Sequence, residues 1–180
     1  MTKTFLISDH HFSQQSILTF KRDDDSLLRP GFESTEEMDE HMINSHNSVV
    51  SNNDKVYFLG DIHSGASTRF DSIMSRLNGN KVLIKGNHDK HKLVSYSKWF
   101  KDIRAYSNLD RCILSHIPIS TGSLGRFALN IHGHTHARNV MLDNGELDVR
   151  YFCVCVEQPH IDYTPIDFEQ IREFIKKTFD

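Results

Sequence analysis

The chain has 180 residues, a formal net charge of −3 and three cysteines. This length suits one core, so we expect residues 1–180 to form a single domain. The slightly negative charge provides no global basic field to attract nucleic acid, and an odd number of cysteines argues against a disulfide framework. No stretch approaches the roughly 20 apolar residues of a membrane span, and the N-terminal apolar run is too short for a signal peptide. We therefore expect a cytoplasmic protein with no membrane partner.

Short apolar runs alternate with helical patterns along the chain, and its second half is richer in strands. Five of these runs predict strands, at 4–8, 55–59, 81–85, 112–115 and 127–131. Helices are expected at 14–20, 38–50, 68–77, within 91–100 and at 167–179. Residues 102–105 and 111–114 are expected to form a hairpin joined by Ser107 and Asn108, and 147–156 a further strand. This order of elements predicts an α/β sandwich.

Polar side chains follow or lie within the five predicted strands. They are Asp9 and His11, Asp61 after Gly60, Asn87, His88 and Asp89 after Gly86, the lone His116, and His134 and His136 after Gly133. Strand ends that line one crevice are where α/β sheets build their sites. Oxygen and imidazole ligands without thiolates suit divalent ions such as Mn, Fe, Zn or Mg. The sequence therefore predicts a metal site, with two ions rather than one.

Each cluster alone has an ordinary structural explanation. Asp89 could begin the next helix as its N-cap, and an isolated His116 would be an ordinary, partly buried histidine. A purely structural role is harder to devise for two histidines on one glycine-containing turn, His134 and His136. It is the combination of all five clusters that favours a functional site.

The five clusters in this order resemble the calcineurin-like metallophosphoesterases. The pattern of that superfamily runs D-x-H, G-D, G-N-H-D/E, a lone His and G-H-x-H, and here it spans residues 9–136. The tail, at 154–156 and 162–166, is similar to small bacterial and phage members. The resemblance implies a four-layer α-β-β-α sandwich of two mixed sheets.

The resemblance also implies a role for each matched residue. The first metal would be held by Asp9, His11 and His136, the second by Asn87, His116 and His134, with Asp61 between them. His88 would face the scissile phosphate, where it would stabilise the transition state or protonate the leaving oxygen. The cofactors would be two divalent ions, manganese first, with iron, zinc, nickel and magnesium as alternatives. Hydrolysis would proceed by direct attack of a hydroxide that bridges the ions.

Substrate contacts are expected from loops. Arg126 follows a glycine-containing loop, Lys90 follows the third cluster, and His63 and His10 are neighbours of the expected ligands. For Arg126 and Lys90, a solvated surface charge is an equally good reading, and His63 could simply cap a turn. The acidic run 23–25 is expected to be a solvated loop. The V-D-R-G that follows Gly-Asp in the Ser/Thr protein phosphatases of the superfamily is missing, which argues against that branch.

The leading hypothesis is a phosphomonoesterase or phosphodiesterase that acts on a small, nucleotide-like phosphate ester. An alternative is a nuclease or nucleic-acid-end phosphatase, with nucleic-acid ends as the partner. A third reading is a protein-binding scaffold without catalysis. Scaffold members of this fold typically lose metal ligands or the catalytic histidine, whereas His88 and all seven ligand positions are present here.

Overall fold

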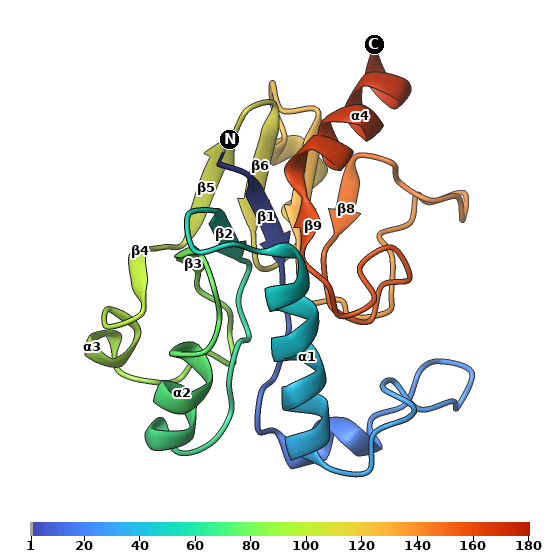
Figure 1. Cartoon of the computed structure of the whole chain (residues 1–180). Helices are drawn as coiled ribbons and strands as arrows, with labels where there is room; N and C mark the ends of the chain where they lie inside the picture. Colours follow the sequence, from blue (N-terminus) through green and yellow to red (C-terminus); the bar gives the residue numbers. More distant parts are fainter. Residues whose placement is uncertain (1) are drawn as a thin grey trace.

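A computed structural model describes residues 2–180, which form two mixed β-sheets with helices around them (Figure 1). The five-stranded sheet has the order β4-β3-β2-β1-β9, with strands β1 (Thr4–Ile7), β2 (Lys55–Phe58), β3 (Asn80–Ile84), β4 (Phe100–Arg104) and β9 (Ile166–Asp167). Only β9 runs antiparallel to its neighbour. The four-stranded sheet has the order β5-β6-β7-β8, with strands β5 (Tyr106–Leu109), β6 (Cys112–Ser115), β7 (Leu129–His132) and β8 (Tyr151–Cys153). The predicted α/β class with two mixed sheets is confirmed.

The helical segments are η1 (Gln15–Thr19), α1 (Thr35–Val49), α2 (Ser67–Met74), α3 (Leu93–Tyr96), η2 (Thr121–Ser123) and α4 (Phe168–Phe179). The two longest begin at side-chain caps. Ser34 accepts a hydrogen bond from the Glu37 N–H at 3.1 Å, and Asp167 accepts one from the Glu169 N–H at 3.1 Å. In the described chain, no helix is long and apolar enough to cross a lipid bilayer.

The parallel order of β1, β2 and β3 brings their carboxyl ends to one edge of the five-stranded sheet. The other sheet is joined to this edge through Ser8, whose N–H donates to the Val154 carbonyl at 2.9 Å and whose carbonyl accepts from the Val156 N–H at 3.2 Å. These bonds bring the segments after β6 and β7 to the same place, since β7 pairs with both β6 and β8. Five polar clusters that lie far apart in the sequence therefore meet where the two sheets join.

The predicted hairpin at 102–114 is wrong in one strand and in its turn. Residues 102–104 belong to β4, which pairs in parallel with β3 in the five-stranded sheet, and the chain crosses to the other sheet after Ala105. The true hairpin is β5–β6, in which Leu109 faces Cys112. Asp110 begins its turn at φ 53°. Ser107 and Asn108, expected at the turn, lie inside β5, because pairing with β6 outweighs their turn preference.

The predicted strand at 147–156 is too long, because β8 covers only Tyr151–Cys153. Asp148 accepts two hydrogen bonds from the Arg150 guanidinium, at 2.8 and 2.6 Å, and the Tyr151 N–H closes a turn on the Asp148 carbonyl at 3.1 Å. This local structure ends the extended conformation before β8. The helix predicted at 14–20 is the 3₁₀ segment η1, and the short strand β9 was not predicted.

The two sheets are covered differently on their outer sides. Helix α1 packs on the five-stranded sheet, where the His46 ring stacks on Phe58 with centroids 5.7 Å apart. Ile113 of β6 points away from the main core and forms a small cluster with Leu124 and Tyr151. The partly buried side chains around this cluster are Ile119, Phe127 and Val140, which belong to loops. In the described residues, loops rather than a helix therefore cover this part of the second sheet.

Candidate metal centre

The backbone is strained at the residues predicted to bind metal. Positive φ angles, which are uncommon outside glycine, occur at five of them: Asp9 (60°), His11 (49°), Asp61 (51°), His134 (70°) and His136 (52°). Each such conformation costs on the order of 1–3 kcal/mol, and such residues cluster at functional sites. Five of the seven predicted ligands share this feature, which is a structural sign of function independent of the sequence motifs.

The first cluster contains Asp9, His11 and His136, as predicted. Their ligand atoms lie within 4.8 Å of one another. Asp9 Oδ1 lies 3.8 Å from His11 Nε2 and 4.0 Å from His136 Nε2. Asp9 Oδ1 and His11 Nε2 are buried without a hydrogen-bond partner. Buried polar atoms are normally paired, so these two fit a cation between them.

The second cluster contains Asp61, His116 and His134, whose ligand atoms also lie within 4.8 Å of one another. His116 Nε2 is 3.3 Å from Asp61 Oδ2 and 2.9 Å from Asn87 Oδ1, so the predicted amide ligand lies beside this cluster. Asp61 Oδ2 is also 3.8 Å from His11 Nε2 of the first cluster. One carboxylate oxygen thus lies between the two clusters, as expected for a ligand shared by two ions.

Three of the histidines are held by their Nδ1 atoms, so that Nε2 faces the other residues of the clusters. His11 Nδ1 contacts Gln14 Oε1 at 2.8 Å, and His136 Nδ1 contacts Glu157 Oε1 at 3.0 Å. His116 Nδ1 donates to the Leu59 carbonyl at 2.7 Å. Metal-binding histidines usually donate their other ring nitrogen to such an oxygen, which fixes the tautomer and the ring orientation. The donor set and its support fit a divalent cation in each cluster.

The electrostatics of the clusters favour positive charge. Burial alone would raise the pKa of Asp9, but the neighbouring imidazoles of His11, His116 and His136 outweigh it and hold this pKa far below its usual value. Burial alone would lower the pKa of His116, but Asp61 and Asp9 raise it to about 9. Without a cation, the carboxylates therefore favour a proton on His116, and a bound cation would take the place of that proton.

Two glycines of the sequence motifs cannot be replaced without a clash, because side chains of other clusters lie too close for a Cβ atom. A Cβ on Gly133 would overlap Ser8 Oγ and Asp9 Oδ2, and a Cβ on Gly86 would overlap Asp61 Oδ1. The carboxylates therefore lie directly against the backbone of neighbouring clusters. Asp9 Oδ2 is further fixed by the His134 N–H at 2.8 Å.

Asp89 is not a helix N-cap, contrary to the simpler explanation of its position, because Lys92 occupies that position in α3. The Asp89 carboxylate accepts backbone N–H groups of Asp61 at 3.0 Å, Ile62 at 3.0 Å and Gly86 at 2.8 Å. It thereby ties the second and third clusters together. Burial nevertheless raises its pKa, since these hydrogen bonds only partly offset the loss of solvent.

No family model matches the chain. The uncharacterized protein MJ1445 of Methanocaldococcus jannaschii is 32% identical over 179 residues, which cover 98% of this chain and 93% of that protein. The chain belongs to the MJ1445 family.

Among solved structures, the crystal structure of AQ665, a protein of unknown function from Aquifex aeolicus, superposes with a TM-score of 0.72. The sequence identity is 24%, with 96% of this chain and 99% of that chain covered. This likeness shows a shared fold.

His88, the predicted catalytic residue, lies at the edge of the clusters. Its side chain is exposed, and its ring centroid is 5.5 Å from that of His11. Its backbone N–H donates to Asp61 Oδ1 at 2.7 Å. His88 is therefore next to both clusters without being part of either.

None of the four residues predicted to contact the substrate lines a cavity beside the clusters. His63 is buried, its Nδ1 2.9 Å from His91 Nε2, and His10 is buried between Phe12 and Phe58. Neither can reach a substrate without moving, because both rings are packed among aromatic neighbours. Lys90 and Arg126 are exposed, and Arg126 lies over its neighbour Phe127. Neither lines a pocket beside the clusters.

Sequence reasoning missed the buried ion pair behind the first cluster. Arg29 Nε donates to Glu157 Oε1 at 2.8 Å, and the same carboxylate oxygen contacts His136 Nδ1. The Arg29 guanidinium also donates to the backbone carbonyls of Asp9 at 2.5 Å and His10 at 2.6 Å. One arginine thus supports two ligand-bearing loops. The sequence shows that both residues are charged but not that they pair, since they lie 128 positions apart.

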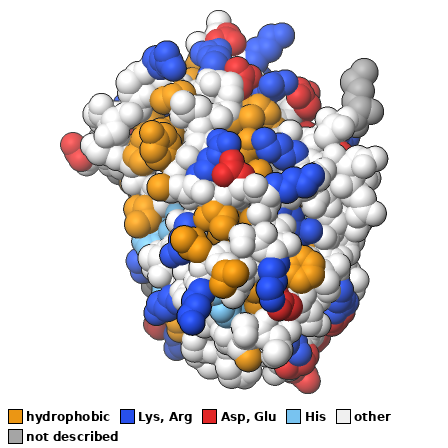
Figure 2. Space-filling view, turned by 90° about the vertical axis from the view of Figure 1, so that its left-hand side faces the viewer, with side chains coloured by type: hydrophobic (Ala, Val, Ile, Leu, Met, Phe, Trp, Pro, Cys, Tyr) orange, Lys and Arg blue, Asp and Glu red, His pale blue; other side chains and the backbone are white. Residues whose placement is uncertain are grey.

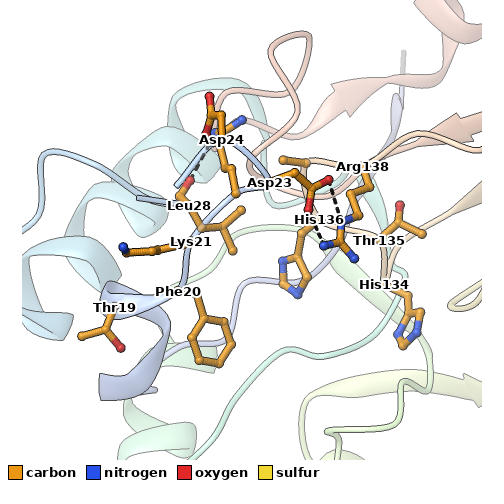
Figure 3. A pocket seen from close by; sticks show the side chains of 12 residues that line it. Thr19, Phe20, Lys21, Asp23, Asp24, Leu28, His134, Thr135, His136 and Arg138 are labelled. Atoms are coloured by element: carbon orange, nitrogen blue, oxygen red, sulfur yellow. Dashed lines mark hydrogen bonds and ion pairs between the residues drawn. The ribbon is translucent and has the colours of Figure 1, made fainter. Parts of the chain in front are cut away.

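The acidic run 23–25 is exposed, as expected for a solvated loop, with the Asp23 side chain 71% and the Asp25 side chain 90% exposed. Asp23 and Asp24 line a cavity of about 860 Å³ that His134 and His136 border on the other side. Asp23 forms an ion pair with Arg138, drawn as dashed lines in Figure 3. A second cavity, of about 560 Å³, lies beside Asn87 and His116. The clusters therefore open toward two cavities that could receive parts of a ligand.

Proposed function

We propose that the protein is a phosphoesterase with a dinuclear metal centre, of the calcineurin-like class. The observation that carries the proposal is Asp61, whose Oδ2 lies 3.8 Å from a histidine of the first cluster and 3.3 Å from one of the second. Two divalent ions held there would supply positive charge for the phosphate oxygens and a nucleophile from water at neutral pH. Manganese is the first candidate, with iron, zinc, nickel and magnesium as alternatives.

The protein's own groups would orient the ester and move the proton. Asp61 Oδ1 holds the backbone N–H of His88, so the carboxylate between the clusters also positions the proposed catalytic residue. The exposed His88 imidazole can donate a proton to the departing oxygen, because histidine is the side chain most often used as a general acid. Direct hydrolysis without a covalent enzyme intermediate needs no further nucleophile from the chain.

The fold is compatible with this proposal. The two mixed sheets support the four-layer α-β-β-α sandwich of the metallophosphoesterases, with loops in place of a helix over the Ile113 cluster. The proposed substrate is a small, nucleotide-like phosphate ester. On the face in Figure 2, Lys and Arg side chains are interspersed with acidic and hydrophobic groups instead of forming one continuous stripe. This face offers no continuous basic stripe for a long nucleic acid.

Hydrolysis of p-nitrophenyl phosphate and bis-p-nitrophenyl phosphate by metal-stripped protein, with and without added Mn²⁺, tests the proposal. We expect Mn²⁺-dependent turnover, and the ratio of the two rates would separate monoester from diester chemistry. His88→Asn should lower kcat about 10²- to 10⁴-fold while metal binding is retained. His41→Asn is the matched control, because His41 is an exposed histidine that contacts Phe32 and Tyr163, away from the clusters. Equal turnover of both variants, or no turnover of either ester with any divalent ion bound, would reject the proposal.

A further inference from the structure

A short arm, residues 20–28, stands beside the candidate metal centre. Lys21 and Leu27 pair in an antiparallel bridge, and the Arg22 N–H donates to the Ser26 carbonyl at 2.8 Å. The Leu28 N–H closes the base of the arm on the Phe20 carbonyl at 2.7 Å. The next residue is Arg29, which is bound to the Asp9 and His10 carbonyls. The arm is therefore fixed relative to the first metal cluster.

The arm forms one wall of the cavity of about 860 Å³, and the two histidines that line this cavity are His134 and His136, one from each cluster. Figure 3 shows the Phe20 ring and His134 on opposite sides of this space, with His136 between them. A volume of this size is typical of small-molecule sites. A phosphate at the clusters would thus have room for its ester group against the arm.

Phe20 has no evident structural reason to face this cavity. Its side chain is 43% exposed, and in the described chain no aromatic ring stacks against it. Phe12, by contrast, is fully buried and is covered by His10 at a centroid distance of 4.8 Å. An exposed aromatic ring beside a phosphate site is a platform on which a planar ring of a ligand can stack.

The rim of the cavity offers both donors and acceptors. Lys21, Arg22 and Arg138 contribute cationic groups, and Asp23 and Asp24 contribute carboxylates. The Asp23–Arg138 pair joins the arm to the loop that carries His134 and His136. Sugar hydroxyls and base edges also combine donors and acceptors, so this rim suits a nucleoside better than an unsubstituted phenyl ring.

We propose that this cavity binds the nucleoside of a nucleoside phosphate, with the base stacked on Phe20 and the phosphate at the metal clusters. The inference rests on the proposed function, and it assigns the substrate class and a specificity-determining residue. The ligand is a single nucleotide, because a cavity of about 860 Å³ has the size of a small-molecule site.

Calorimetric binding of 5′-AMP, ribose 5-phosphate and phosphotyrosine to the Mn²⁺-loaded protein tests this inference without requiring turnover. We expect AMP to bind at least about tenfold more tightly than the other two, as base–aromatic stacking commonly provides. Phe20→Ala should remove most of that preference and leave the affinity for ribose 5-phosphate unchanged, and Phe20→Trp should retain it. The matched control is Leu27→Ala, since Leu27 is 44% exposed on the same arm but does not line the cavity.

Unchanged AMP affinity in Phe20→Ala would overturn the inference, as would equal binding of AMP and phosphotyrosine by the unmodified protein. An AMP preference that depends on Phe20 would support it even if neither chromogenic ester were hydrolysed, and only the proposed catalytic function would then fail. Turnover of those esters without any AMP preference would reject the nucleoside cavity and leave the catalytic proposal intact.

Discussion

Glu157 shows how much of the centre depends on single residues outside the motifs. Its side chain is fully buried, and one of its oxygens contacts both Arg29 and His136. The other oxygen has no hydrogen-bond partner. The interactions with Arg29 and His136 offset the effect of burial, so the pKa of Glu157 stays below its usual value. The residue remains a carboxylate that positions one of the expected metal ligands.

Replacing Glu157 with Gln keeps its shape but leaves the buried Arg29 without a counter-charge. We expect a loss of about 3–5 kcal/mol in the free energy of unfolding. Mn²⁺ affinity should fall about 10- to 100-fold, as for other supports of metal-binding histidines. Urea unfolding and Mn²⁺ titration measure the two effects. The control is Glu40→Gln, which removes an exposed pair with Arg76 and should change stability by less than about 1 kcal/mol. Unaltered Mn²⁺ binding in Glu157→Gln would show that Glu157 has no positioning role.

A substitution of Gly133 tests the close approach of the Asp9 carboxylate to the backbone. Gly133→Ala would place a methyl group against Ser8 Oγ and Asp9 Oδ2, so we expect Asp9 to be displaced and Mn²⁺ affinity to fall by at least about tenfold. Gly122→Ala is the control, because its Cβ would meet only Ser120 Oγ at 3.9 Å. A metal titration of both variants checks this, and equal affinities would mean that the cluster tolerates a shift of Asp9.

At the scale of elements, short-range patterns predicted the strands well where each strand is a continuous apolar run. β1, β2 and β3 were found within a residue or two, because all three are buried and end at polar residues. The strands of the segment 100–115 were not predicted correctly, because β4 belongs to one sheet and β5 and β6 belong to the other. No local property of Ala105 signals that the chain leaves one sheet for the other. That choice is made by partners distant in the sequence, β3 for β4 and β6 for β5.

The packing of α1 on the five-stranded sheet should be sensitive to acid. Burial lowers the pKa of His46 to about 4, partly offset by its contact with the Asn78 carbonyl at 3.0 Å, and the charge of Lys81 lowers it further. Since the unfolded pKa is about 6.5, the unfolded chain binds a proton that the folded state excludes between these values. The contribution of the neutral His46 to the free energy of unfolding is complete above pH 6.5 and is lost as the pH falls toward 4.

Urea unfolding of the unmodified protein and of His46→Gln at pH 7.5 and pH 4.5 isolates this effect, because other titrating groups are common to both. We expect the unmodified protein to lose about 2–3 kcal/mol more than the variant over this range. An equal loss in both proteins would mean that His46 is protonated without disturbing the packing of α1.

At the scale of the whole molecule, the sequence located the residues of the two candidate clusters but not the residues that support them. That these seven residues lie together could be predicted, because each follows a strand within a short motif and the sheets bring those ends together: Asp9, His11, Asp61, Asn87, His116, His134 and His136. The sequence did not predict the roles of Arg29, Glu157 and Phe20, because these roles depend on contacts that form only when the arm folds back on the centre. His10 and His63 were predicted to contact the substrate because they neighbour the expected ligands in the sequence. Their side chains instead point into the core.

The central claim is that two metal ions share one site through Asp61. Electron paramagnetic resonance during a Mn²⁺ titration tests it most directly, because ions about 3.5–4 Å apart are close enough for magnetic coupling. We predict that two Mn²⁺ ions bind per chain and that the six-line signal of isolated Mn²⁺ gives way to a coupled spectrum. Asp61→Asn should abolish the coupling. One ion per chain, or an uncoupled six-line spectrum at saturation, would contradict the dinuclear centre.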